Sequence, residues 1–225
     1  MVRMAELLIS FNKAAASAKR ISDVLAEEPE ITDGEKPLTV QEQAPVLAFD
    51  HVTFAYPDGG EAAIHDISFS LRAGETLGII GGTGSGKSTI ANLIPRFYDT
   101  TEGTVRIYGE DVRSYTLDSL RQVIGVVPQK ASLVSGTIAE NLRWGDAAAD
   151  DAELEHACKI AQAWEFVSQT SRGLETKVTQ GGRSLSGGQK QRLTIARAVA
   201  KHPKLFVFDD SFSALDLKTD AALRQ

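Results

Sequence analysis

The sequence predicts an α/β domain with a β-rich edge, preceded by a separate helix. Apolar and polar residues alternate, as they do in strands, over much of residues 46–80. From residue 87 onward, helical and strand patterns follow one another, which is typical of an α/β core. At the start of the chain, an amphipathic stretch is followed by a polar segment that contains two prolines.

The composition is that of an ordinary folded domain. The chain has 225 residues, of which 42% are hydrophobic and 24% charged, and this balance excludes wholesale disorder. The net charge of −6 argues against a protein that binds nucleic-acid phosphates. The single cysteine, Cys158, excludes an internal disulfide and a multi-thiolate metal site, and it is better explained as a packed residue than as a nucleophile. No signal peptide and no membrane-spanning run is recognisable, so we expect this chain itself to be soluble and intracellular.

Residues 1–27 are predicted to form one helix. Its apolar residues recur at steps of four and three and share one face: Leu7, Phe11, Ala14, Ala18, Ile21 and Leu25. The helix ends before Pro29, and residues 31–45 are expected to be a linker. The helix is either a surface helix of the same domain or one whose apolar stripe packs on another domain upstream. The linker favours the second interpretation.

The remaining elements are expected in the following order. Three strands are predicted over residues 46–57, 64–71 and 76–80. A helix then runs from Lys87 to about Phe97. Further strands are expected near residues 104–108, 123–127 and 205–208, and helical segments over 117–122, 137–143, 150–169 and from Ser186 to His202.

A phosphate-binding loop is predicted where the strand 76–80 meets the helix that follows it. The pattern G-x-x-x-x-G-K-[ST] is matched by Gly81, Gly82, Thr83, Gly84, Ser85, Gly86, Lys87, Ser88 and Thr89. Glycines let several backbone N–H groups turn toward one phosphate, Lys87 supplies positive charge, and Ser88 supplies a hydroxyl for Mg²⁺. The alternative, a Gly/Ser-rich turn that happens to end in Lys-Ser, is disfavoured by the strand and helix on either side.

Two further motifs lie downstream. Asp209 and Asp210 follow a buried apolar strand, where a carboxylate can hold Mg²⁺ or, alternatively, cap the next turn. The run Leu185-Ser186-Gly187-Gly188-Gln189 begins a helix and forms a second candidate anion site. Two such helix starts in one small domain do not easily reach the same phosphates, which indicates that the second one serves a partner's nucleotide.

Together these motifs resemble the nucleotide-binding domains of ATP-binding cassette (ABC) transporters. The features occur in the family's order: Tyr56, the loop at 81–89, Gln129, LSGGQ at 185–189, Asp209 and SALD at 213–216. The resemblance implies a P-loop NTPase fold over residues 46–225, with a RecA-like core, an antiparallel β subdomain and an α-helical subdomain. Residues 1–30 resemble the end of the last membrane helix of an exporter.

The resemblance also implies ligands and roles. ATP and Mg²⁺ are the expected cofactors, with Tyr56 stacking on adenine and with Ser88, Gln129 and Asp209 holding the metal. Gln129 would also sense the γ-phosphate, and Asp210 would stand in the place of the catalytic base. The residues expected to contact the nucleotide of an opposite subunit are Ser186, Gly187, Gly188 and Gln189, and Asp216 would lie at the dimer seam.

The chain departs from the family pattern at three places. Asp210 stands where the catalytic glutamate is usual, and Gln180 stands where exporters commonly have a glutamate. The family's switch histidine is expected some thirty residues past Asp209, and none of the chain's histidines (His51, His65, His156 and His202) stands there.

These features predict the ATPase domain of an exporter, at the cytoplasmic face of the cell membrane. Its expected partners are a second nucleotide-binding domain in a head-to-tail dimer, a fused transmembrane domain, and no nucleic acid. The substitution at Asp210 favours a heterodimer with one degenerate site. The alternatives are a regulatory nucleotide-binding subunit with little hydrolysis, a non-transport ABC ATPase acting on DNA or ribosomes, and a small P-loop kinase or GTPase. The last of these gives no account of LSGGQ or Tyr56.

Overall fold

A computed structural model describes residues 2–57, 59–212 and 219 of the chain. The chain divides into two units, Met1–Thr32 and Asp33–Gln225. Each unit is described separately below.

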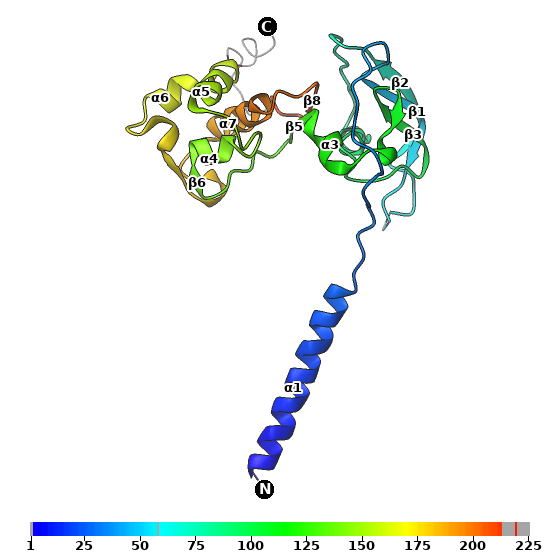
Figure 1. The fold of residues 1–225 in the computed structure, drawn as a ribbon, viewed down its shortest axis with the longest axis vertical. Helices are drawn as coiled ribbons and strands as arrows, with labels where there is room; N and C mark the ends of the chain where they lie inside the picture. Colours follow the sequence, from blue (N-terminus) through cyan, green and yellow to red (C-terminus); the bar gives the residue numbers. More distant parts are fainter. Residues whose placement is uncertain (1, 58, 213–218, 220–225) are drawn as a thin grey trace. The chain divides into compact units, whose positions relative to one another are not determined.

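The first unit consists of one long helix, α1 (Val2–Leu25), drawn in blue in Figure 1. The predicted helix is therefore confirmed, and its apolar stripe is uncovered: Leu7 and Phe11 are each 70% exposed, and Leu25 is 80% exposed. A single helix in water gains little from its own hydrogen bonds and depends on packing for stability. Within the described part of the chain, no helix combines the length and the apolarity needed to cross a membrane.

We therefore expect trypsin to cut α1 long before it cuts the second unit. Lys13, Lys19 and Arg20 are exposed on this helix, and exposed helical backbone with few buried contacts opens readily to a protease. Limited digestion followed by mass spectrometry should first give a product that begins near Ile21. Survival of α1 for as long as the second unit would show that the stripe is covered within this chain.

The start of the second unit packs on a distant segment. The Asp33 carboxylate accepts a hydrogen bond from the Leu117 backbone N–H at 2.6 Å, and the Gly34 N–H donates to the Tyr115 carbonyl at 3.0 Å. A Cβ at Gly34 would lie only 2.4 Å from the Tyr115 oxygen, so glycine is required for this approach. The polar composition of residues 31–45 did not predict these contacts.

An antiparallel sheet of four strands forms the β-rich part, in the order β2-β1-β3-β4. Its strands are β1 (Leu47–Phe54), β2 (Ile64–Leu71), β3 (Glu102–Ile107) and β4 (Glu110–Asp111). Strand β1 is central and pairs with both β2 and β3. Its alternating apolar residues, including Leu47, Phe49 and Val52, are buried on one side of the sheet.

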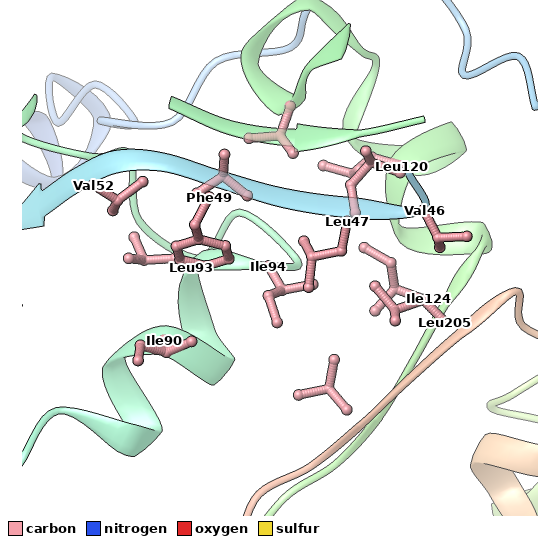
Figure 2. Close-up of a cluster of buried hydrophobic side chains, with 14 of the residues drawn as sticks. Val46, Leu47, Phe49, Val52, Ile90, Leu93, Ile94, Leu120, Ile124 and Leu205 are labelled. Carbon is pink, nitrogen blue, oxygen red and sulfur yellow. The ribbon is translucent and has the colours of Figure 1, made fainter. Parts of the chain in front are cut away.

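The helix that follows the predicted phosphate loop packs against this sheet. Helix α2 (Lys87–Leu93) contributes Ile90 and Leu93, which lie beneath Phe49 and Val52 of β1 in Figure 2. The helix ends at Leu93 instead of the expected Phe97. Pro95, which has no N–H to donate, breaks the helical pattern there.

A parallel pair of strands provides the α/β character. Strand β5 (Ile124–Val127) pairs in parallel with β8 (Leu205–Phe208), and Ile124 and Leu205 join the same core in Figure 2. The predicted strand at 76–80 is wrong for this structure, because these residues have no regular secondary structure and pair with no strand among the described residues. Leu77, Ile79 and Ile80 are accordingly 45%, 44% and 98% exposed.

The remaining part is mainly helical and has a core of its own. Its helices are α4 (Ile138–Leu142), α5 (Asp151–Ile160), α6 (Trp164–Ser168) and α7 (Gly187–Ala200), and a short pair is formed by β6 (Gly136–Thr137) and β7 (Lys177–Val178). Helix α3 (Leu117–Gln122), which lies beside β5, matches the expected range. In the part of the chain that the structure describes, three single 3₁₀ turns lie at Val112–Ser114, Gly173–Glu175 and Gln180–Gly182.

The expected helical region 150–169 is two helices. The chain turns between them at Gln162, which has a φ of 53° in the left-handed region. Asp150 caps α5 by accepting from the Glu153 N–H at 2.9 Å, as the acidic start of this segment predicted. Cys158 is fully buried in α5, and burial raises the pKa of its thiol to about 12, so the interpretation as a packed residue is supported.

Candidate functional site

The loop at residues 81–89 curls around the side chain of Lys87. The Lys87 ammonium donates to the carbonyl oxygens of Gly81 at 2.8 Å and Gly82 at 2.7 Å, and it lies 3.4 Å from the Ser85 hydroxyl. The loop's cation is thus held over the loop itself, where an anion would meet both the ammonium and the backbone N–H groups.

Glycine is required at the end of this loop. Gly86 has a φ of 86°, and a Cβ there would lie 2.4 Å from Ile64 Cγ2 and 2.7 Å from the Ala63 carbonyl oxygen. Gly84 also adopts a positive φ, of 80°, with open space around its Cα. The sequence pattern therefore has a steric cause at Gly86 and a conformational one at Gly84.

Tyr56 lies beside the same loop. Its hydroxyl is 3.1 Å from the Thr89 hydroxyl, and its ring meets Phe54 and Tyr98 edge-on at 4.8 and 5.2 Å between centroids. A cavity of about 270 Å³ is lined by Tyr56, Ala63 and the loop from Gly84 to Thr89. The aromatic residue and the phosphate loop thus share one cavity, an arrangement suited to a ligand with a planar ring and phosphate groups.

The two carboxylates after β8 meet residues from the loop and from the segment that follows β5. Asp209 Oδ1 accepts a hydrogen bond from the Ser88 hydroxyl at 3.1 Å. Asp210 Oδ2 accepts from the Gln129 amide at 3.2 Å. A larger cavity of about 710 Å³ has Lys87 and these four side chains in its lining. Residues separated by 121 and 81 positions in the sequence are therefore brought together around one cavity.

Backbone contacts fix the two aspartates. The Asp209 N–H donates to the Val127 carbonyl at 3.0 Å, and the Ser211 hydroxyl donates to the same oxygen at 2.6 Å. Asp210, between them, has a φ of 45°, a conformation that aspartate tolerates better than most residues. This local turn directs the Asp210 carboxylate toward Gln129.

The side chains around this cavity fit a magnesium ion bound to a nucleoside triphosphate. Ser88 Oγ, Asp209 Oδ1 and the Gln129 amide oxygen are hard oxygen ligands, the kind that Mg²⁺ prefers. The loop glycines leave the backbone open to phosphate oxygens, since a Cβ at Gly82 would meet nothing within 4 Å.

The start of α7 forms a separate feature. The Ser186 hydroxyl accepts from the Gln189 N–H at 3.2 Å, while Gln189 Oε1 accepts from the Ser186 N–H at 2.9 Å. This reciprocal cap already pairs two N–H groups at the second candidate anion site, although the Ser186 hydroxyl keeps its own proton for donation. Neither cavity is lined by Ser186, Gly187, Gly188 or Gln189, all of which the structure describes. The start of α7 thus lines neither of the two cavities that the phosphate loop borders.

The other predicted residues are placed as follows. Gln180 begins a 3₁₀ turn, and the Gly181 N–H after it donates to the Leu133 carbonyl at 2.9 Å. Asp216 lies outside the described residues. Sequence patterns did not predict that Ala63 and Ile64, at the start of β2, contact the phosphate loop. Both residues lie against Gly86.

Comparisons with known proteins identify the family of this chain. A family model described as "ABC transporter" matches residues 64–213. A multidrug efflux ATP-binding/permease protein of Mycobacterium bovis is 41% identical over 99% of this chain and 18% of its own length. A probable multidrug resistance ABC transporter ATP-binding/permease protein of Bacillus subtilis is 40% identical over 99% of this chain and 38% of its own length.

A solved structure of an exporter has a similar fold. A bacterial Atm1-family ABC exporter with ATP bound superposes with a TM-score of 0.87 at 35% identity, covering 95% of this chain and 37% of that one. The chain thus spans well under half the length of the proteins that it matches. The α/β fold with a preceding helix, predicted from the motifs, is confirmed by this likeness.

Proposed function

Because the chain belongs to the ABC transporter family, we propose that it is the ATP-hydrolysing domain of an exporter that moves its substrate across the cell membrane. The observation that carries this proposal is the pair of contacts Ser88–Asp209 and Gln129–Asp210 beside Lys87. A hydroxyl, a carboxylate and a cation around one cavity are the parts that phosphoryl transfer from ATP needs.

Each group has a distinct role in this proposal. Lys87 and the loop N–H groups bind the outer phosphates, and Tyr56 packs against the adenine ring. Ser88, Gln129 and Asp209 hold Mg²⁺, which when bound supplies positive charge to the terminal phosphates. Asp210 accepts the proton of the attacking water, and the Gln129 amide orients its carboxylate through the 3.2 Å hydrogen bond.

The exposed apolar stripe of α1 needs a surface to pack on. We assign this surface to the helices of a membrane domain, because both relatives described above are named as ATP-binding/permease proteins. Residues 1–30 would then be the end of the last membrane-domain helix and 31–45 the connection to the ATPase domain 46–225. This places the ATPase domain at the cytoplasmic face of the membrane.

The start of α7 supports a dimer. Ser186 and Gly187 are exposed and lie outside both cavities of their own chain, so they are available to a nucleotide bound by a second domain. A head-to-tail dimer supplies that nucleotide. Since Asp210 replaces the usual glutamate, the dimer is proposed to be a heterodimer whose site on this chain's loop is degenerate. Asp210 equally favours a second candidate, a subunit that binds nucleotide for regulation and hydrolyses very little.

Light scattering and phosphate release test this proposal together. The purified chain with ATP and Mg²⁺ should bind nucleotide yet hydrolyse it slowly, and it should dimerise with a homologous domain that has the glutamate. Fast phosphate release by the chain alone, in a homodimer, would contradict the degenerate site. No binding of ATP at all would contradict the ATPase assignment.

A further inference from the structure

Helix α7 is hydrogen-bonded to the segment 128–132 on both sides of Gln129. The Gln191 amide of α7 donates to the Pro128 carbonyl at 3.4 Å, and the Arg197 Nη1 group donates to the Ser132 carbonyl at 3.2 Å. Gln129, between these two anchors, is bonded to Asp210 in the nucleotide cavity. A displacement of Gln129 therefore acts on α7.

Arg197 makes the larger part of this attachment. Besides the Ser132 carbonyl, its Nε donates to the Asn141 carbonyl at 2.8 Å and its Nη2 to the Asn141 side-chain oxygen at 3.2 Å. Asn141 is fully buried and in turn donates to the carbonyls of Val134 and Thr137, both at 3.0 Å. One guanidinium thus holds the whole segment from Ser132 to Asn141.

The chemistry of Arg197 indicates a positional role. Among the described residues no carboxylate pairs with it, and burial lowers the pKa of its guanidinium. A partly buried cation with neutral partners alone is a costly way to stabilise a core. Its planar fork, however, fixes three oxygens in one geometry, which lysine does not reproduce.

The other end of the same helix is Ser186. Helix α7 runs without a break from Gly187 to Ala200, so Ser186 and Arg197 lie about 16 Å apart along one rigid element. A second connection reaches the segment before Ser186. The Gly181 N–H donates to the Leu133 carbonyl at 2.9 Å, and β6 pairs with β7.

From this arrangement we infer that Arg197 is a positioning residue that links Gln129 to Ser186. Nucleotide binding at this chain's loop shifts the Gln129 segment, Arg197 passes the shift to α7, and the position of Ser186 changes. The inference rests on the proposed function, in which Ser186 faces the nucleotide of a second domain. It adds that the two sites of the dimer are coupled through this guanidinium.

Hydrogen exchange in the monomeric chain tests the coupling. Adding ATP and Mg²⁺ should slow exchange at residues 81–89 and also, by about fivefold, at 132–142 and 185–190, whereas strand β3 of the antiparallel sheet should not respond. In Arg197→Lys the response at 81–89 should remain and that at 185–190 should be lost. Arg192→Lys is the matched control, because Arg192 lies on the same helix but contacts the Gln162 carbonyl and the Phe166 ring.

The outcomes separate the two proposals. If ATP does not protect residues 81–89 in the wild type, the proposed function fails, and the inference fails with it. If 81–89 respond but 185–190 do not, or if Arg197→Lys responds as the wild type does, the inference is wrong and the function stands. If Arg197→Lys does not fold, the absence of a response at 185–190 in the wild type still overturns the inference.

Turnover in the assembled dimer gives an independent readout. Arg197→Lys should lower kcat about tenfold at the site that Ser186 completes, with the ATP affinity of this chain's own loop unchanged. A merely structural role would instead lower both affinity and thermal stability. An unchanged kcat would overturn the inference.

Discussion

Replacing Lys87 by alanine should weaken ATP binding about tenfold to a hundredfold. The Lys87 ammonium is the cation that lies over the loop, bonded to Gly81 and Gly82, and phosphates would otherwise depend on backbone N–H groups. A hydrogen bond to a charged group contributes roughly 1.5–3 kcal/mol, which corresponds to this range of affinities. Titration with a fluorescent ATP analogue in the presence of Mg²⁺ measures the change.

The control for this substitution is Lys177→Ala. Lys177 is an exposed lysine of β7 and lines neither cavity, so its loss should leave the affinity unchanged. Thermal unfolding of both variants checks that the loop substitution leaves the domain folded. Equal affinity in Lys87→Ala and the wild type would remove the basis for the nucleotide site.

Lengthening Asp210 to glutamate should raise ATP turnover at this site by about a hundredfold in the assembled transporter. A general base must come within hydrogen-bond distance of the attacking water. On the same backbone the aspartate carboxylate stops roughly 1.3–1.5 Å short of a glutamate carboxylate, about one C–C bond. A misplacement of about 1 Å can cost on the order of a hundredfold in rate.

The neighbouring aspartate provides a matched control. Asp209→Glu adds the same methylene one position earlier, but it moves the carboxylate that Ser88 contacts, so it should lower turnover. Steady-state phosphate release for the two variants and the parent decides between them. If Asp210→Glu leaves turnover unchanged, the degenerate-site hypothesis is wrong, and a different group acts as the base.

The sequence predicted elements whose limits are set by local chemistry. Helix α3 and strands β2 and β8 match the expected ranges, because turn residues, proline and alternating apolar residues lie next to them. One contact of the candidate site was predictable for a related reason. The loop at 81–89 and Asp209 follow patterns of residue type that suit phosphate and Mg²⁺, and the fold does bring Ser88 to Asp209. Gln129 was singled out only through the resemblance to the family.

What the sequence did not predict depends on contacts between distant segments. The apolar run 76–80 has the composition of a strand, but a strand also needs a neighbouring backbone, and no pattern in these residues specifies one. The attachment of Asp33 to Leu117 and of Arg197 to Ser132 joins residues 84 and 65 positions apart. Such pairs leave no periodic signal in a single sequence.

The free side of β8 has a consequence for the behaviour of the protein at high concentration. Within residues 2–57 and 59–212, β8 pairs with β5 alone, and Phe206 and Phe208 stack on each other while each is 41% exposed. An open strand edge flanked by aromatic side chains is a template for pairing with another copy of the chain, which favours aggregation. Leu77 and Ile79, which are 45% and 44% exposed, line the same cavity as Phe206 and Phe208 and add further apolar surface. We therefore expect the exposed edge of β8 to lower the solubility of the separate chain. A neighbouring chain or domain that covers this edge should reduce aggregation.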